Sequence, residues 1–215
     1  MSGTPLSRYA GPITFIVGAY MAITHVVLFF ILNRGDADRL VLVADPVFRV
    51  LNVAYAAAFA GLFLALFAAY TRQAREAGGF GLIALFAAIV GTFTLGADMW
   101  FEGFATPWLL EVFPQLLTAE RTTIWVIGYF SSYVLFALGW VLFGLASLRA
   151  RVFPVPISVA LTIGGLIGFL AAGPPWGAAL GLALAWLGRW LITADHTDET
   201  NSEPAMLSTR NHLRD

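Results

Sequence analysis

Long apolar runs, separated by short polar connections, dominate the pattern of the chain. A helix needs about 20 apolar residues to cross a hydrocarbon core roughly 30 Å thick. Stretches of about that length cover residues 13–32, 47–70, 80–101, 123–148, 154–172 and 176–192. In lipid, apolar runs this long satisfy their backbone hydrogen bonds as helices. The pattern therefore predicts an all-α polytopic membrane protein with six transmembrane helices.

Arginines in the connections predict the orientation of these helices. One side carries Arg8, Arg72, Arg75, Arg149, Arg151 and Arg189. The other side carries Arg34, Arg39, Arg49 and Arg121. Basic residues are enriched in cytoplasmic connections, so this excess predicts cytoplasmic N- and C-termini. Six acidic residues fall on the outer side, which agrees with that orientation: Asp36, Asp38, Asp45, Glu102, Glu111 and Glu120.

Two segments lie outside the predicted spans. Residues 103–121 are too short to cross the bilayer and too apolar for an ordinary loop. They predict a helix lying in the outer interface, with Trp108 as its anchor. Residues 194–215 are polar throughout and predict a disordered cytoplasmic tail. The transmembrane domain then covers residues 1–193.

Small residues recur at helical spacing in the last two predicted spans. Gly164 and Gly168 are four residues apart, and Gly177 and Gly181 repeat this spacing. Such faces let two backbones approach closely. A Gly-Pro-Pro turn tethers the two helices, so contact within this hairpin is the favoured interpretation, with a dimer interface as the alternative. The tryptophans, including Trp140 in the inner half, are interpreted as aromatic belts.

Composition narrows the class of protein further. The chain has 215 residues, of which 59% are apolar and 12% charged, and its mean hydropathy is +0.79. These values exclude an ordinary soluble enzyme and a disordered chain. It has no cysteine and no lysine, which excludes disulfides, thiolate chemistry and Schiff bases. A net charge of −1 offers no basis for binding nucleic acid.

Polar side chains in or beside the predicted spans gather in the outer half of the membrane. Such groups are costly in a bilayer and usually face the bundle interior. They come from four helices and comprise His25, Asn52, Asp98, Glu102, Tyr129 and Ser132. On the fourth helix, Trp125, Tyr129, Ser132 and Phe136 share one face. We predict that the six residues line an outward-facing ligand pocket roofed by residues 103–121, with His25 and Asp98 as its natural pair.

A structural interpretation stands beside this one for each residue alone. A single membrane histidine often serves as a hydrogen-bond partner, and Asp98 and Glu102 lie close enough to the interface to be solvated. Asn52 could bond to a neighbouring helix. The sequence contains no zinc-binding HExxH, no GxSxG elbow and no phosphate-binding glycine loop. No catalytic residue, metal site or cofactor is therefore predicted.

The last three predicted spans carry a recurrent pattern. It consists of residues 138–144 (LGWVLFG), 149–154 (RARVFP), the pair at 164–165 (GG) and 185–190 (AWLGRW). It resembles that of small, uncharacterised six-helix membrane proteins of high-GC bacteria. The resemblance implies the fold and a bacterial inner membrane, and it implies no activity or site.

Two classes of function are consistent with these observations. In the first, the protein binds or passes a small solute, a proton or a lipid through the outer pocket. In the second, it is a non-catalytic accessory or structural subunit whose glycine faces and aromatic belts contact a partner or a second copy. An intramembrane enzyme is the least supported alternative. The expected partner in every case is the lipid bilayer.

Overall fold

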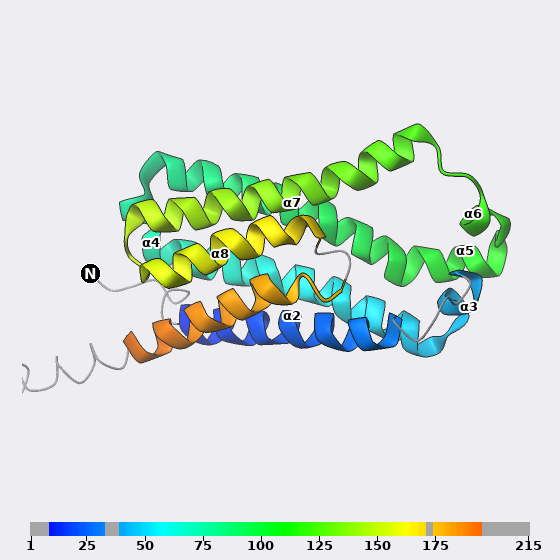
Figure 1. The fold of residues 1–215 in the computed structure, drawn as a ribbon, viewed down its shortest axis with the longest axis horizontal. Coiled ribbons are helices and arrows are strands. Elements are labelled where there is room, and N and C mark those ends of the chain that lie inside the picture. Colours follow the sequence, from blue (N-terminus) through cyan, green and yellow to red (C-terminus); the bar gives the residue numbers. More distant parts are fainter. Residues whose placement is uncertain (1–8, 33–38, 171–173, 195–215) are drawn as a thin grey trace, which may run out of the picture.

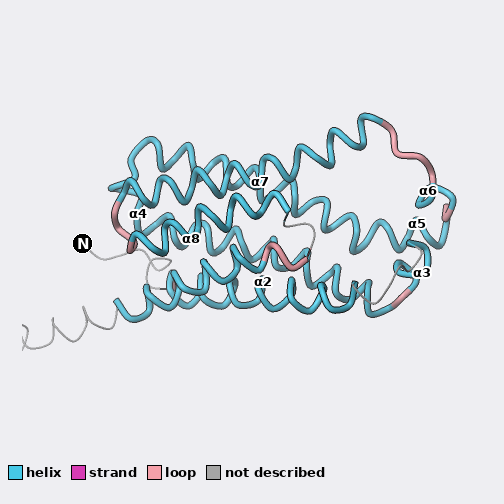
Figure 2. The backbone as a smooth tube through the Cα atoms, in the orientation of Figure 1, coloured by secondary structure: helices cyan, strands magenta, loops and turns pink. Residues whose placement is uncertain are grey.

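The computed structural model describes residues 9–32, 39–170 and 174–194 of the chain. All regular elements within these ranges are helical, and the longer helices lie along one axis (Figures 1 and 2). This confirms the all-α prediction. The predicted tail 194–215 lies outside the described residues, apart from its first residue.

The helices follow one another with short connections. They are α2 (Ala10–Leu32), α3 (Arg39–Ala44), α4 (Pro46–Trp100), the π-helical turn η1 (Phe101–Ala105), α5 (Thr106–Val112), α6 (Gln115–Thr118), α7 (Thr123–Ala150), α8 (Val155–Ile167), the 3-10 turn η2 (Gly168–Leu170) and a last helix (Ala178–Ala194). One end of the bundle holds α3, α5 and α6, and we call it the α5 end (Figure 1).

The long helix α4 is two antiparallel legs joined at a sharp reversal. Gly78 has φ 57° and ψ −150°, a backbone conformation that L side chains rarely adopt. The first leg, residues 46–77, runs away from the α5 end, and the second leg, residues 79–100, returns to it (Figure 1). The legs match the predicted spans 47–70 and 80–101, but residues 71–77 continue the helix instead of forming a loop. We call the reversal the Gly78 end of the bundle.

Within the described ranges, three helices are long and apolar enough to cross a membrane, namely Ala10–Ile31, Pro46–Val112 and Thr123–Ala150. The second of these contains the Gly78 reversal. Two further apolar helices, Val155–Leu170 and Ala178–Ala194, are shorter.

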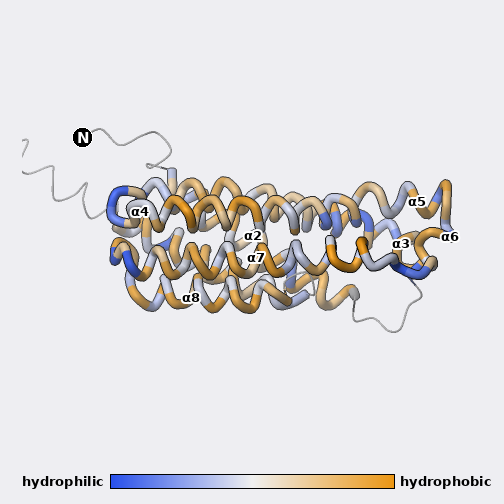
Figure 3. Tube along the Cα trace, turned by 90° about the horizontal axis from the view of Figure 1, so that it is seen from above, coloured by the Kyte–Doolittle hydropathy of each residue, from blue (hydrophilic) through white to orange (hydrophobic). Residues whose placement is uncertain are grey.

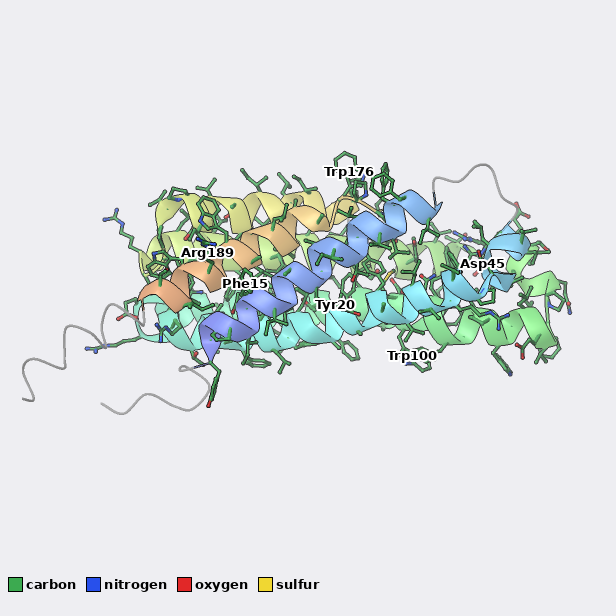
Figure 4. The ribbon with its side chains drawn as sticks, turned by 90° about the horizontal axis from the view of Figure 1, so that it is seen from below. Phe15, Tyr20, Asp45, Trp100, Trp176 and Arg189 are labelled. Atoms are coloured by element: carbon green, nitrogen blue, oxygen red, sulfur yellow. The ribbon has the colours of Figure 1, made fainter. Side chains whose placement is uncertain are left out.

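The outward surface of the helices is apolar. Side chains such as Ile16, Phe86 and Leu166 are each at least 65% exposed. Apolar positions dominate the middle of the bundle, and many hydrophilic positions lie toward its ends (Figure 3). Trp100 and Trp176 project from the bundle in different directions (Figure 4). An apolar middle between more polar ends is what a bilayer requires.

The segment predicted to lie separately in the interface instead extends the second leg of α4. The helix continues through η1 into α5 and ends at Val112. Pro107 lacks an N–H and would clash with a carbonyl one turn earlier. A π-helical turn precedes it and opens the helix at that point. The prediction of a separate interfacial helix is therefore wrong for residues 103–112, although Trp108 remains 55% exposed.

Glycines set the closest helix contacts. A Cβ at Gly164 would lie 2.8 Å from the Cα of Leu180, which confirms contact within the predicted hairpin. A Cβ at Gly181 would lie 2.7 Å from the backbone nitrogen of Ala22, so this glycine serves contact with α2 instead. Both glycines therefore make close contacts between helices of the same chain.

Trp140 belongs to the core and not to an aromatic belt. Its side chain is 0% exposed, and its indole N–H donates to the Oγ1 of Thr92 at 3.0 Å. Phe59, Phe136 and Phe143 are also fully buried and pack in the same cluster. The belt interpretation is wrong for Trp140 because its apolar run does not specify which face points inward.

Candidate functional site

A groove opens between α7 and the second leg of α4 near the α5 end. Residues 119–128 are all exposed, and α7 diverges from α4 toward this end (Figure 1). The space between them has a volume of about 380 Å³. We call it the α7 groove; it is lined by Ala97, Asp98, Phe101, Glu102, Ile124, Trp125, Gly128 and Tyr129.

The groove forms because the two helices touch closely only nearer their middles. There Gly91 of α4 and Gly139 of α7 bring the backbones together. Toward the α5 end, Tyr129 and Trp125 line the α4-facing side of α7. Large rings at an interface hold helices further apart than glycines do.

Asp98 lies in the groove wall and is hydrogen-bonded to Ser132. The Ser132 hydroxyl donates to Oδ2 of Asp98, and it also lies 2.7 Å from the carbonyl oxygen of Tyr129. This contact joins α4 to α7 at the inner limit of the groove. It fixes the position of the carboxylate without neutralising its charge.

One face of α7 carries a stack of aromatic groups at four-residue spacing. The ring of Trp125 stacks on that of Tyr129, with centroids 4.9 Å apart and planes 13° apart. The guanidinium of Arg121 lies 4.1 Å from the Trp125 centroid, and the Tyr133 hydroxyl donates to that of Tyr129. Positions four apart in a helix lie one above the other, so the stack follows the groove wall.

Glu102 is already paired with a basic residue. Its two carboxylate oxygens accept from Nη2 of Arg39 at 2.8 and 3.1 Å, and Thr106 Oγ1 donates to it at 3.3 Å. The pair holds α3 against η1. The Arg39 and Glu102 side chains are 39% and 21% exposed, so the contribution of the pair to stability is small, about 1 kcal/mol or less.

His25 lies deeper, behind the groove. It is 0% exposed, its Nδ1 is 3.5 Å from the hydroxyl of Tyr55, and its Nε2 has no hydrogen-bond partner in the part of the chain that the structure describes. The ring lies against the backbone of Gly177, where a Cβ would collide with it. Within the described residues, His25 has Tyr55 as a hydrogen-bond partner and Asp98 has Ser132, so the predicted pairing of the two stays a prediction.

Asn52 does not contribute to the groove. Its Nδ2 donates to the carbonyl oxygen of Phe48 at 2.9 Å, one turn earlier in the same helix. Its backbone packs against Gly103 of η1, where a Cβ would lie 3.3 Å from the Asn52 carbonyl carbon. The structure therefore gives Asn52 a role in helix packing.

Four of the six predicted residues come together at the groove. They are Asp98, Glu102, Tyr129 and Ser132. Sequence reasoning missed Tyr133 and Arg39 as site residues. The position of Tyr133 four residues after Tyr129 is a signal that could have identified it. Arg39 reaches Glu102 across 63 residues of chain, which no local pattern reveals.

Two further cavities border the groove. One, of about 330 Å³, shares Tyr129 and extends to Phe169 and Trp176. The other, of about 290 Å³, shares Phe101, Glu102 and Trp125 and is lined also by residues of the 106–122 segment. The segment predicted to cover the pocket, residues 103–121, therefore lies beside the α7 groove.

No group of three or more His, Asp or Glu side chains that could hold a metal ion is present in the described part of the chain. Comparison of the chain with protein-family models, with curated proteins and with solved structures gives no match. Fold and site together describe a helical protein that has helices suited to a membrane and a mixed polar and aromatic groove near one end.

Proposed function

We propose that the protein is a multi-pass membrane protein that binds a small amphipathic solute or a lipid in the α7 groove. The observation that carries the proposal is the groove wall itself. It combines the Asp98 carboxylate with the Trp125 and Tyr129 rings in a space of ligand size. An intramembrane ionisable residue is by default a candidate for function.

We also propose that the chain crosses the membrane six times, through α2, the two legs of α4, α7, α8 with η2, and the last helix. The 16 residues of Val155–Leu170 extend about 24 Å at 1.5 Å per residue, somewhat less than the hydrocarbon core. Local thinning of the bilayer accommodates such a mismatch at modest cost. We place the protein in a bacterial inner membrane.

The groove is tested by filling it. Gly128 lines the groove, and a Cβ there meets nothing within 4 Å, so Gly128→Leu occupies the space without a clash. Gly79 also meets nothing within 4 Å but lies at the opposite end, so Gly79→Leu is the matched control. The measurement is native mass spectrometry of full-length protein extracted gently from its own membrane. We expect a reproducible small-molecule adduct on the wild type and Gly79→Leu that is lost in Gly128→Leu.

A second candidate function is an accessory subunit of a membrane complex. It is favoured by the exposure of every side chain in residues 121–128, where Ile124 is 81% exposed and Ile127 63%. Residues 124–127 form an exposed apolar stretch, which suits contact with another helix. In the same mass measurement, a stoichiometric second polypeptide on all three proteins, with no small adduct, would favour this function over ligand binding.

The proposed orientation places both chain ends in the cytoplasm, and the Gly78 end of the bundle is then the cytoplasmic end. Arg189 lies toward the Gly78 end and Asp45 toward the α5 end (Figure 4), and Arg72, Arg75 and Arg149 lie near the Gly78 reversal or at the matching end of α7.

Because the chain has no cysteine, single introduced cysteines report orientation cleanly. We expect Ala119→Cys in intact cells to react with a membrane-impermeant maleimide and Glu76→Cys to react only after lysis. The reverse labelling pattern would invert the orientation.

A further inference from the structure

The groove contains an acidic side chain that no described basic side chain pairs with. Glu102 is paired with Arg39, and Glu111, outside the groove, lies 3.5 Å from Arg49. The guanidinium of Arg121 lies over Trp125. Asp98, by contrast, bonds to the neutral Ser132 and forms no ion pair within the described residues. Partial burial of a carboxylate is costly unless a cation compensates it.

The other walls of the groove suit a cation that carries an apolar body. Phe101, Trp125 and Tyr129 present aromatic rings to the groove, against which an apolar body packs. The Trp125 ring is itself stacked on Tyr129 and covered by Arg121. Ala97 and Ile124 are exposed and apolar, so the groove is open to an apolar group arriving from the side.

We infer that the α7 groove binds a lipophilic organic cation, with its ammonium-type group beside the Asp98 carboxylate and its apolar body against Phe101, Trp125 and Tyr129. This inference rests on the proposed function and specifies its ligand class. An anionic amphipath would lie beside the Asp98 carboxylate, which repels it, and Arg39 is already paired with Glu102. The headgroup of a zwitterionic lipid and a free lipophilic amine share the required chemistry.

The test compares hydrophobic ions of the same shape and opposite charge. Full-length protein in detergent is titrated by equilibrium dialysis with radiolabelled tetraphenylphosphonium, tetraphenylborate and the neutral triphenylphosphine oxide. We expect saturable binding of the phosphonium cation alone. Asp98→Asn removes the charge but keeps an oxygen that accepts from Ser132, so the variant should fold. We expect it to weaken cation binding by about tenfold or more.

Glu111→Gln is the matched control, since it removes a carboxylate from the same end of the protein but outside the groove. Its affinity for the cation should equal that of the wild type. Equal cation affinity in Asp98→Asn and the wild type would overturn the inference, as would equal binding of the anion.

Gly128→Leu separates failure of the inference from failure of the proposed function. If the neutral compound or the anion binds, and Gly128→Leu abolishes that binding while Asp98→Asn does not, the groove site stands and the cation assignment is wrong. If Gly128→Leu leaves the binding of all three compounds unchanged, both proposals are wrong.

Lipid nanodiscs distinguish the two sources of the cation. Phosphatidylcholine discs are compared with phosphatidylglycerol discs, using the uncharged detergent sample as the reference. Competition that is Asp98-dependent and specific to phosphatidylcholine supports the inference and assigns the site to a lipid headgroup. Saturable, Asp98-dependent binding without such competition supports it and assigns the site to a free amine.

Discussion

Replacing Gly91 with alanine is expected to lower the free energy of unfolding by about 3 kcal/mol. A Cβ at Gly91 would overlap the carbonyl oxygen of Leu135 and lie 2.6 Å from its carbonyl carbon. These are backbone atoms, so no side chain can rotate away and the helices must separate. The loss appears as a lower midpoint of thermal unfolding in detergent, followed by tryptophan fluorescence.

The facing residue Gly139 tests whether this is one shared contact. A Cβ at Gly139 would lie 2.5 Å from the carbonyl oxygen of Ala87. Gly139→Ala should therefore cost about as much as Gly91→Ala. The double variant should lose less than the sum, because the first alanine has already moved the helices apart.

Gly128→Ala is the control for this pair. Gly128 lies in α7 as well, but its Cβ would meet nothing within 4 Å. Alanine favours the helix over glycine by about 1 kcal/mol, so this variant should be as stable as the wild type or more so. Identical midpoints for Gly91→Ala and Gly128→Ala would show that α4 and α7 do not cross so closely.

Replacing His25 with leucine is expected to raise the free energy of unfolding of the ligand-free protein by about 1–2 kcal/mol. Most substitutions in a buried core destabilise. Here a stabilising effect is expected because, among the described residues, Nε2 of His25 is buried without a hydrogen-bond partner and Nδ1 has a 3.5 Å contact with the Tyr55 hydroxyl. An apolar side chain of similar volume removes the cost of burying that polar atom. Thermal unfolding in detergent is again the measurement.

Thr14→Val is the matched variant for this prediction. Oγ1 of Thr14 is likewise buried with no hydrogen-bond partner among the described residues, and valine has the same shape. It should also stabilise. If His25→Leu instead destabilises by several kcal/mol while Thr14→Val stabilises, the imidazole makes a structural contact that the described residues do not account for.

The apolar runs predicted the helices well because the run length needed for a membrane helix is a local property. The helical segments at 10–32, 46–77, 79–100 and 123–150 lie within a few residues of the expected runs. The prediction that polar groups gather toward one end of the bundle also grouped Asp98 with Ser132, and the two are hydrogen-bonded.

Rotation of each helix about its own axis was not predictable in the same way. His25 faces Tyr55 and Gly177 rather than Asp98, and Asn52 bonds within its own helix. An apolar run presents no polar stripe to mark its buried face. Which face turns inward depends on where neighbouring helices approach, and that is decided by contacts between distant residues.

The sequence by itself therefore determined an all-helical chain with helices suited to a bilayer, and it grouped Asp98 with Ser132. Only the tertiary structure decided that Gly91 and Gly139 close one part of the α4–α7 interface while Trp125 and Tyr129 hold the other part open. It also decided that Arg39 pairs with Glu102 and that Asp98 has no basic partner among the described residues. The physical reason is that hydrophobicity acts through local composition, whereas charge pairing and close packing depend on which helix faces meet.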